Sequence, residues 1–272
     1  MYQVLIPVDD DENRARRQAE YAASLPNSGS DVEVTVLYVV PPRRLDTAEE
    51  VDFEEVDSAV TAAENLESHH VTVDRRVGDG GVSEEILRVA DELDCDELVM
   101  GGRKRSGVAQ VLLGSTVRDV FVSTERPVTI TGSGMVFEGG SREVLLPVDR
   151  NLERARRQVE YATALPNAAE NVTATVLYVF PHQDYRGAPP HEFEDVDAAV
   201  ETADSLEAAG LSVERVSIGG EVARKVLETA EEREVDSIVM GGRKRSGVQK
   251  TLLGSIAQDV MLSADRPVTL TG

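Results

Sequence analysis

The sequence repeats itself without a gap. Residues 1–132 and 141–272 align at a constant offset of 140 positions, and 64 of the 132 aligned pairs are identical. The longest shared block runs from Val99 to Val108 and returns from Val239 to Val248. Each copy has the length of a whole domain, and two copies are too few for a solenoid. The duplication therefore predicts one fold used twice, packed as a pseudo-twofold pair with a related functional surface in each copy.

The expected domain boundaries follow this repeat. We expect a first domain over residues 1–132, a linker over 133–142 and a second domain over 143–272. The linker is rich in glycine, which is typical of a flexible connection. Three apolar residues inside it leave two readings open, because Met135, Val136 and Phe137 could pack into the junction or only fill a gap in the local surface.

Short apolar runs alternate with longer amphipathic stretches. In the first copy we expect strands over 4–8, 32–40, 71–77, 97–100 and 127–131, and helices over 12–25, 49–69, 82–93 and 115–123. The second copy repeats this order between residues 144 and 271. The alternation predicts an α/β fold with two tandem doubly wound, Rossmann-like domains, each a five-stranded parallel sheet of order 3-2-1-4-5. Ligands of such sheets bind at the carboxyl ends of the first and fourth strands, where the strand order reverses.

The net charge of the chain limits the classes of binding partner and indicates the environment in which the protein works. The formal net charge is −22, and only four of the 28 basic residues are lysines. So acidic a surface repels nucleic acid and anionic membranes, so neither is expected as a partner. Acidity with little lysine favours a halophilic protein over an ordinary acidic cytosolic one. The chain also shows neither a signal peptide nor an apolar stretch of membrane-spanning length, so we expect it to be cytoplasmic.

Cysteine and histidine offer little chemistry. Cys95 is the only cysteine, which excludes an intramolecular disulfide, and Val235 takes its place in the second copy. This replacement favours a small buried hydrophobe over a reactive thiol. The histidines show no metal-ligand spacing and no counterparts in the other copy, so we interpret all four as surface residues: His69, His70, His182 and His191.

The loop after the fourth expected strand carries the most chemistry. It combines three glycines with three cations: Gly101, Gly102, Gly114, Arg103, Lys104 and Arg105. Ser115 is a natural N-cap, and the free N–H groups of residues 115–117 together with the helix dipole favour an anion there. The loop returns intact in the second copy. One alternative stays open, in which the glycines only allow tight turns and the cations only offset the acidic surface.

Three motifs carry a resemblance to a known family. They are Leu5–Asp9, Gly114-Ser115 and Arg126–Val128, each with a counterpart in the second copy. On these residues the sequence resembles the universal stress protein (UspA) family in its tandem two-domain form, and its acidity suggests a haloarchaeal type. The resemblance implies a Rossmann-like fold, dimerisation through the fifth strand and a role in the stress response. It also implies binding of an adenine nucleotide, ATP or AMP, with Mg²⁺ held only through the phosphates.

The ATP-binding branch of that family uses the motif G-x-x-G-x(9)-G-[S/T]. Gly101, Gly114 and Ser115 match its first, third and last positions, but Lys104 and Lys244 replace the middle glycine in the two copies. In the family, the Asp after the first strand and the end of the second strand also contact the nucleotide. The expected nucleotide-binding residues are therefore Pro7, Asp9, Tyr38, Val39, Gly101, Gly102, Arg103, Lys104, Gly114, Ser115 and Thr116 in the first copy, and Pro147, Asp149, Tyr178, Val179, Gly241, Gly242, Arg243, Lys244, Gly254 and Ser255 in the second.

Two features of this expected site have more than one reading. A lysine in the glycine position could block the approach of phosphate, or its ammonium could contact phosphate directly. The acidic run Asp9–Glu12 could bind a cation, but only Asp9 returns in the second copy. We therefore interpret Asp9 as facing the site and the other acidic residues as charge at a helix N-terminus.

The sequence favours a stress-response or signalling module that binds an adenine nucleotide in each domain without fast catalysis. No general base, Walker A motif or G-x-S-x-G motif is evident, so we do not expect an enzyme beyond slow ATP hydrolysis. The main alternative is a nucleotide-free, pseudo-dimeric interaction scaffold with degenerate sites. An adenosine-phosphate hydrolase is a distant third, because the glycine-rich loop that such enzymes have after the first strand is missing. A further homodimer of the whole chain stays open.

Overall fold

The computed structural model describes residues 1–41, 51–104, 111–112, 114–132, 140–181, 191–244, 251–252 and 254–272. The main elements of the first half are β1 (Tyr2–Val8), α1 (Glu12–Ala23), β2 (Val32–Val40), α3 (Asp57–Ser68), β3 (Thr72–Asp79), α4 (Val82–Glu92), β4 (Glu97–Gly101), α5 (Ser115–Ser123) and β7 (Val128–Thr131). Those of the second half are β8 (Arg142–Val148), α6 (Leu152–Ala164), β9 (Val172–Phe180), α8 (Asp197–Ala208), β10 (Ser212–Gly219), α9 (Val222–Glu232), β11 (Ser237–Gly241), α10 (Ser255–Ser263) and β14 (Val268–Thr271).

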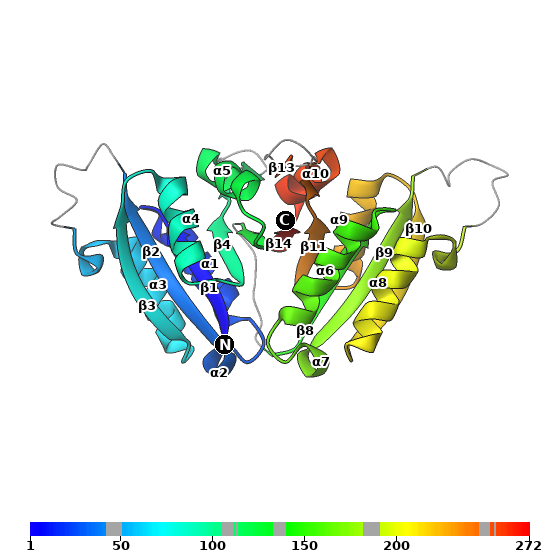
Figure 1. Ribbon diagram of the computed structural model, residues 1–272, viewed down its shortest axis with the longest axis horizontal. Coiled ribbons are helices and arrows are strands. Elements are labelled where there is room, and N and C mark those ends of the chain that lie inside the picture. Colours follow the sequence, from blue (N-terminus) through cyan, green and yellow to red (C-terminus); the bar gives the residue numbers. More distant parts are fainter. Residues whose placement is uncertain are drawn as a thin grey trace.

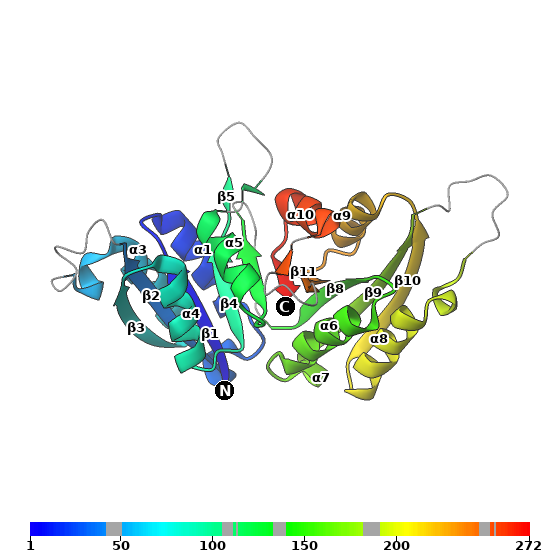
Figure 2. The same cartoon turned by 45° about the horizontal axis from the view of Figure 1, so that its top comes forward.

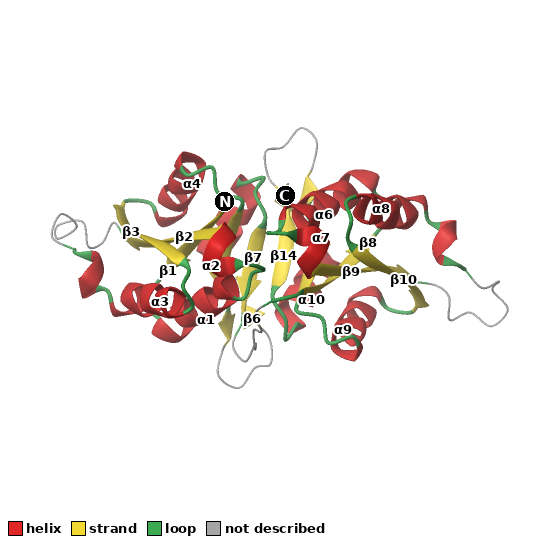
Figure 3. Cartoon of the chain, turned by 90° about the horizontal axis from the view of Figure 1, so that it is seen from below, coloured by secondary structure: helices red, strands yellow, loops and turns green. Residues whose placement is uncertain are grey.

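The main strands form one continuous sheet across both halves. Its order is β10-β9-β8-β11-β14-β7-β4-β1-β2-β3, so each half has the predicted order 3-2-1-4-5. All neighbouring strands are parallel except β7 and β14, which meet antiparallel at the centre with Thr129 opposite Thr269. The two halves are therefore related by a pseudo-twofold axis at this pair of strands (Figures 1 and 3). This confirms the predicted fold class.

The hydrophobic core is divided by sheet face and not by half. Alternate side chains of a strand point to opposite faces, so Ile6 and Leu146 pack under α1, α3, α6 and α8, whereas Leu5 and Leu145 pack under α4, α5, α9 and α10. Each layer contains residues of both halves and runs through the junction. Among the described residues, no helix is both long and apolar enough to cross a membrane.

Several elements differ from the sequence prediction. The helix expected over 49–69 begins only at Asp57, because Phe53–Glu55 forms a separate 3₁₀ turn and Val56 is extended between the two. Phe53 is buried, which fixes this turn against the core. The short helices α2 (Ser28–Asp31) and α7 (Ala168–Asn171) were not predicted.

The expected linker is one residue too long. Its last residue, Arg142, is the buried first residue of β8. Its side chain is 3% exposed, so it belongs to the packed sheet and not to a solvated connection. Residues 133–139, with Met135, Val136 and Phe137, lie outside the described residues.

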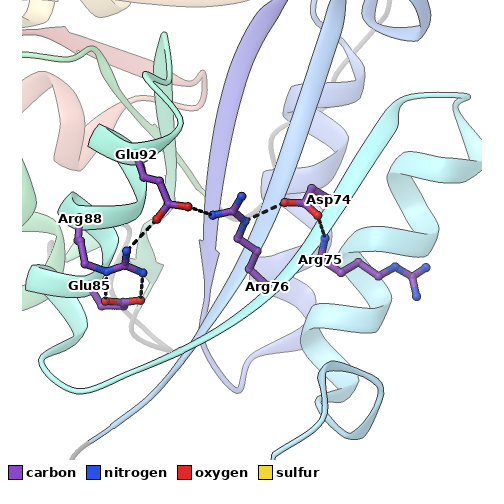
Figure 4. Close-up of polar contacts among 6 residues, drawn as sticks. All are labelled: Asp74, Arg75, Arg76, Glu85, Arg88 and Glu92. Carbon is purple, nitrogen blue, oxygen red and sulfur yellow. Dashed lines mark hydrogen bonds and ion pairs between the residues drawn. The ribbon is translucent and has the colours of Figure 1, made fainter.

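Charged side chains cover the outer edge of the sheet. On the edge strand β3, Arg76 binds Asp74 at 2.8 Å and Glu92 of α4 at 2.9 Å (Figure 4). Arg88 extends this row of ion pairs, with contacts of 2.8 Å to Glu92 and 2.7 Å to Glu85. Hydrogen bonds from Arg76 and Arg88 lower the pKa of Glu92. Charges on an edge strand oppose pairing with a further strand, so these side chains protect the β3 edge against the addition of another strand.

We expect the melting temperature to rise by several degrees between low salt and 1 M KCl. The net charge of −22 makes the surface repel itself, and salt screens exposed charges over about 10 Å at 0.1 M. Salt also weakens surface ion pairs such as those of Arg76, but each exposed pair contributes only about 0–1 kcal/mol. Scanning calorimetry across a KCl series measures this balance. A melting temperature that stays flat or falls would contradict the halophilic interpretation.

Candidate functional site

A crevice opens in each half where the first and fourth strands separate. β1 and β4 pair only at Val4–Glu97 and Leu5–Leu98, and the two strands diverge beyond this point. The side chain of Gln18, from α1, lies between them and donates from Nε2 to the carbonyl oxygens of Pro7 at 2.9 Å and Val99 at 2.8 Å. Its amide satisfies the backbone where the strands no longer pair.

The second half repeats this arrangement. Gln158 donates to the carbonyl oxygens of Pro147 at 2.9 Å and Val239 at 2.7 Å. Both crevices therefore lie at the carboxyl ends of the strands and at the reversal of strand order, as predicted.

The crevice of the first half holds a cavity of about 250 Å³. Its wall brings together eight of the eleven residues expected for the first copy: Pro7, Asp9, Tyr38, Val39, Gly101, Gly114, Ser115 and Thr116. Gly102 is absent from the described wall, and its N–H donates to the carbonyl oxygen of Thr131 at 2.7 Å. The sequence prediction missed an apolar side of the wall, formed by Val82, Ile86 and Met100, and a polar side, formed by Arg14 and Gln18.

The side chain of Arg14 lines the first crevice. Its guanidinium binds Asp9 and lies 2.9 Å from a carboxylate oxygen of Asp11. A Cβ atom on Gly101 would lie 2.1 Å from Cγ of Arg14, so this glycine is required by the passage of the arginine side chain. Arg154 repeats the contact with Asp149 in the second half. The repetition of Arg14 and Gln18 as Arg154 and Gln158 was the sequence signal that could have identified them.

Gly114 has a different reason to be glycine. Ser115 was expected as the N-cap of α5, but it is the first residue of the helix, and Gly114 is the cap. Gly114 has φ −65° and ψ 161°, which any residue adopts, and an added Cβ would meet no atom within 4 Å. Neither backbone conformation nor packing within the described chain requires glycine here. The missing side chain leaves the first-turn N–H groups of α5 open to a ligand.

The loop between β4 and α5 contains a hairpin that the sequence did not predict. β5 (Arg103–Lys104) pairs antiparallel with β6 (Val111–Leu112), and β12 (Arg243–Lys244) pairs with β13 (Thr251–Leu252) in the second half. In the view of Figure 2, β5 lies above α5. β6 lies against α10, and β13 lies against α5, so each hairpin reaches a helix of the other half. Arg105 and the side chains of both Arg-Lys pairs lie outside the described parts of the chain.

The crevice of the second half is smaller. Its cavity measures about 80 Å³. Pro147, Asp149, Gly241 and Gly254 line it as expected, whereas Tyr178, Val179, Gly242 and Ser255 are not part of its described wall.

One substitution between the copies changes the contacts of the tyrosine at the end of the second strand. In the first half, the Tyr38 hydroxyl donates to Asp10 at 2.9 Å, and both residues line the cavity. Asp10 is therefore a wall residue, which corrects its interpretation as a helix charge only. In the second half Arg150 stands in its place and donates from Nε to the Tyr178 hydroxyl at 3.1 Å. The larger side chain lies over the Tyr178 ring at 5.9 Å from its centroid, and neither residue lines the described cavity of the second half.

Other reactive side chains lie away from the crevices. Cys95 is buried, as expected, and burial raises the pKa of its thiol to about 12. His69 and His70 are exposed, His191 stacks on Phe180 with ring centroids 4.8 Å apart, and His182 lies outside the described residues. The described residues contain no group of three or more His, Cys, Asp or Glu that could hold a metal ion.

Comparisons with known proteins agree with this geometry. The model of the universal stress protein family matches residues 1–132 and 140–272. A universal stress protein of Mycolicibacterium smegmatis is 30% identical over 122 residues, which cover 44% of this chain and 82% of that protein. A crystal structure of a universal stress protein from Archaeoglobus fulgidus covers 98% of this chain and 97% of its own, with a TM-score of 0.71 and 21% identity. A universal stress protein from Archaeoglobus fulgidus has also been solved with dAMP; it covers 48% of this chain and 98% of its own, with a TM-score of 0.37 and 23% identity.

Proposed function

The chain belongs to the universal stress protein family, and from this membership we propose that it is a stress-response module that binds an adenine nucleotide without fast turnover. The first crevice is the stronger site, because its cavity is larger and its wall contains more of the residues that match the nucleotide-binding motif. The second crevice binds more weakly, because its cavity is smaller and Arg150 replaces the carboxylate of Asp10.

One observation carries this proposal: Gly114 has no role within the described chain that requires glycine. A glycine that is free of conformational and packing demands, placed as the cap of a helix, fits the close approach of a phosphate. The first-turn N–H groups at Ser115 and Thr116 would hold the phosphate. Mg²⁺ would enter only with the phosphates, since the described residues include no metal-binding group of their own.

The rest of the wall suits the remaining parts of a nucleotide. Val39, Val82 and Ile86 offer an apolar slot for a flat base, and Asp9 and Asp10 are acceptors for ribose hydroxyl groups. Arg14 already binds the carboxylate of Asp9, which leaves this group poorly placed to act as a general base. Fast hydrolysis is therefore not part of the proposal.

The role of Lys104 and Lys244 is tested by titration calorimetry with ATP on the parent and on the Lys104→Gly/Lys244→Gly variant. We expect the parent to bind, because a cationic hairpin beside a helix N-terminus favours an anion. Tighter binding by the variant would identify the lysines as obstacles, and weaker binding would identify them as phosphate ligands. If neither protein binds ATP at millimolar concentration, the nucleotide proposal fails.

The second candidate function is a nucleotide-free interaction scaffold. The Asp9–Arg14 and Asp149–Arg154 ion pairs favour it, because the arginine of each crevice already has a carboxylate partner without a ligand. Mass spectrometry of small molecules extracted from natively purified protein separates the two candidates. Stoichiometric adenine nucleotide supports the binding module, and its absence together with no ATP binding supports the scaffold.

A further inference from the structure

The junction between the halves buries a carboxylate. Glu97 is the first residue of β4, and its side chain is fully buried beside the pseudo-twofold axis. Its carboxylate accepts hydrogen bonds from the hydroxyls of Tyr2 at 3.0 Å and Tyr21 at 2.8 Å, and from Thr129. The Tyr161 hydroxyl, from the other half, donates to the same group at 3.3 Å. Burial raises the pKa of Glu97, and the hydrogen bonds from Thr129, Tyr21 and Tyr2 oppose the shift.

A buried cation from the second half lies near this carboxylate, and Tyr21 stands between the two charges without a direct ion pair joining them. Arg142 is 3% exposed, and its guanidinium lies over the ring of Tyr21 at 4.7 Å from the centroid. Its positive charge lowers the pKa of Glu97 against the effect of burial. Nε of Arg142 is 3.5 Å from Oγ of Ser237, and its Nη1 has no hydrogen-bond partner among the described residues. Charge and ring contact therefore hold this side chain more than hydrogen bonds do.

These two charges do not occupy equivalent positions in the repeat. The offset of 140 relates Glu97 to Ser237 and Arg142 to Tyr2. The residues around them do follow the repeat. The hydroxyl oxygens of Tyr21 and its counterpart Tyr161 are 3.2 Å apart, and those of Thr129 and its counterpart Thr269 are 2.6 Å apart across the axis. A symmetric frame of hydroxyls thus encloses an asymmetric pair of charges, with the anion supplied by the first half and the cation by the second.

This asymmetry distinguishes the correct partner of each half from the wrong one. Two first halves paired through β7 would bury two copies of Glu97 and no guanidinium. Two second halves paired through β14 would bury two copies of Arg142 and no carboxylate. A buried charge that has lost its partner costs more than an ordinary contact at an interface contributes. Repulsive elements of this kind give specificity even where they add no affinity.

We propose that the Glu97–Arg142 pair makes each half selective for the other, so that the junction accepts the unlike half and rejects a second copy of the same half. The partner that the β7 surface fits is therefore a β14 surface with a buried arginine. The proposal does not depend on nucleotide binding.

The full-length chain can mimic both wrong pairings. The Tyr2→Arg/Glu97→Ser variant gives the first half the residues of the second, so two guanidiniums meet at the junction. The Arg142→Tyr/Ser237→Glu variant gives the second half the residues of the first, so two carboxyls meet. We expect each double variant to melt roughly 10 °C or more below the parent.

The matched control contains all four substitutions in one chain. It transposes the pair across the pseudo-twofold axis: the carboxylate moves from position 97 to position 237, and the guanidinium moves from position 142 to position 2, inside the same frame of hydroxyls. We expect it to melt within roughly 3 °C of the parent, although it carries every change that damages the two double variants. A fourfold variant as unstable as the sum of the doubles, or double variants as stable as the parent, would overturn the proposal.

A pH series separates charge from packing. The groups that face the buried pair are Tyr2 from β1, Tyr21 from α1, Tyr161 from α6 and Asp236, which precedes β11. In Arg142→Tyr/Ser237→Glu the two carboxyls take up protons as the pH falls from 7 toward 5, so its deficit relative to the parent should shrink. In Tyr2→Arg/Glu97→Ser the guanidiniums stay charged, so its deficit should remain. Equal pH behaviour of the two double variants would contradict selection by charge.

Discussion

Replacing Val82 by Trp is expected to weaken ATP binding at least about tenfold, because the indole would fill the slot proposed for the base. Val82 is the half-buried first residue of α4 and lines the larger cavity, so a larger side chain projects into the crevice without replacing a fully buried core residue. Titration calorimetry on the full-length protein measures the change. The effect should appear as a lost high-affinity phase, since the second crevice contributes little.

The repeat supplies the matched control for this prediction. Val222 is the equivalent residue in the second half and lines the smaller cavity. Val222→Trp should leave the high-affinity phase nearly unchanged, and the melting temperatures of the two variants should be similar. Equal losses of ATP affinity would mean that the two crevices bind alike, which would contradict the stronger role proposed for the first.

The thiol of Cys95 is expected to react at least about a thousandfold more slowly in the folded protein than in the urea-denatured chain. Burial raises its pKa from 9.0 to about 12, so at neutral pH the reactive thiolate falls by about three orders of magnitude, and the side chain is also 1% exposed. The release of thionitrobenzoate from Ellman's reagent, followed before and after denaturation, measures both rates. Comparable rates in the two states would contradict the buried position.

The raised pKa of the Cys95 thiol also predicts how the stability of the protein depends on pH. The folded state keeps the thiol proton, whereas the unfolded chain loses it as the pH rises through about 9. The unfolded state then binds fewer protons, so stability falls as the pH rises from about 9 toward 12. The Cys95→Val variant lacks this group and has the residue of the second copy, Val235. It should therefore lose less stability than the parent between pH 8 and pH 10 in urea titrations.

The topology could be predicted from the sequence because the repeat and the apolar runs are strong signals. The strand expected over 32–40 and the helix expected over 115–123 have the predicted bounds in the structure. The helix expected over 49–69 was too long, because Phe53 has helical spacing to later apolar residues but packs from a separate turn. Sequence periodicity reports which side chains are buried, and an extended residue such as Val56 does not change that spacing.

The candidate site was only partly predictable, for reasons of geometry. Gly101 and Gly114 look alike in a motif, yet one makes room for Arg14 and the other leaves a helix terminus open. Arg14 and Gln18 come from α1, far along the chain from the glycine-containing loop, and only their return in the second copy marks them. Glu97 and Arg142 could not be found in this way, because neither is repeated. The role of each depends on its difference from the equivalent residue in the other copy.

Each hairpin lies against a helix that borders the crevice of the other half. β6 lies against α10, whose N-terminus borders the second crevice, and β13 lies against α5, whose N-terminus borders the first. If a ligand in one crevice repositions its hairpin, it acts on the helix that the other ligand would contact. Thermodynamic linkage then requires that each ligand change the affinity for the other by the same factor. Under that condition, the response of the tandem chain would depend on the occupancy of both crevices together.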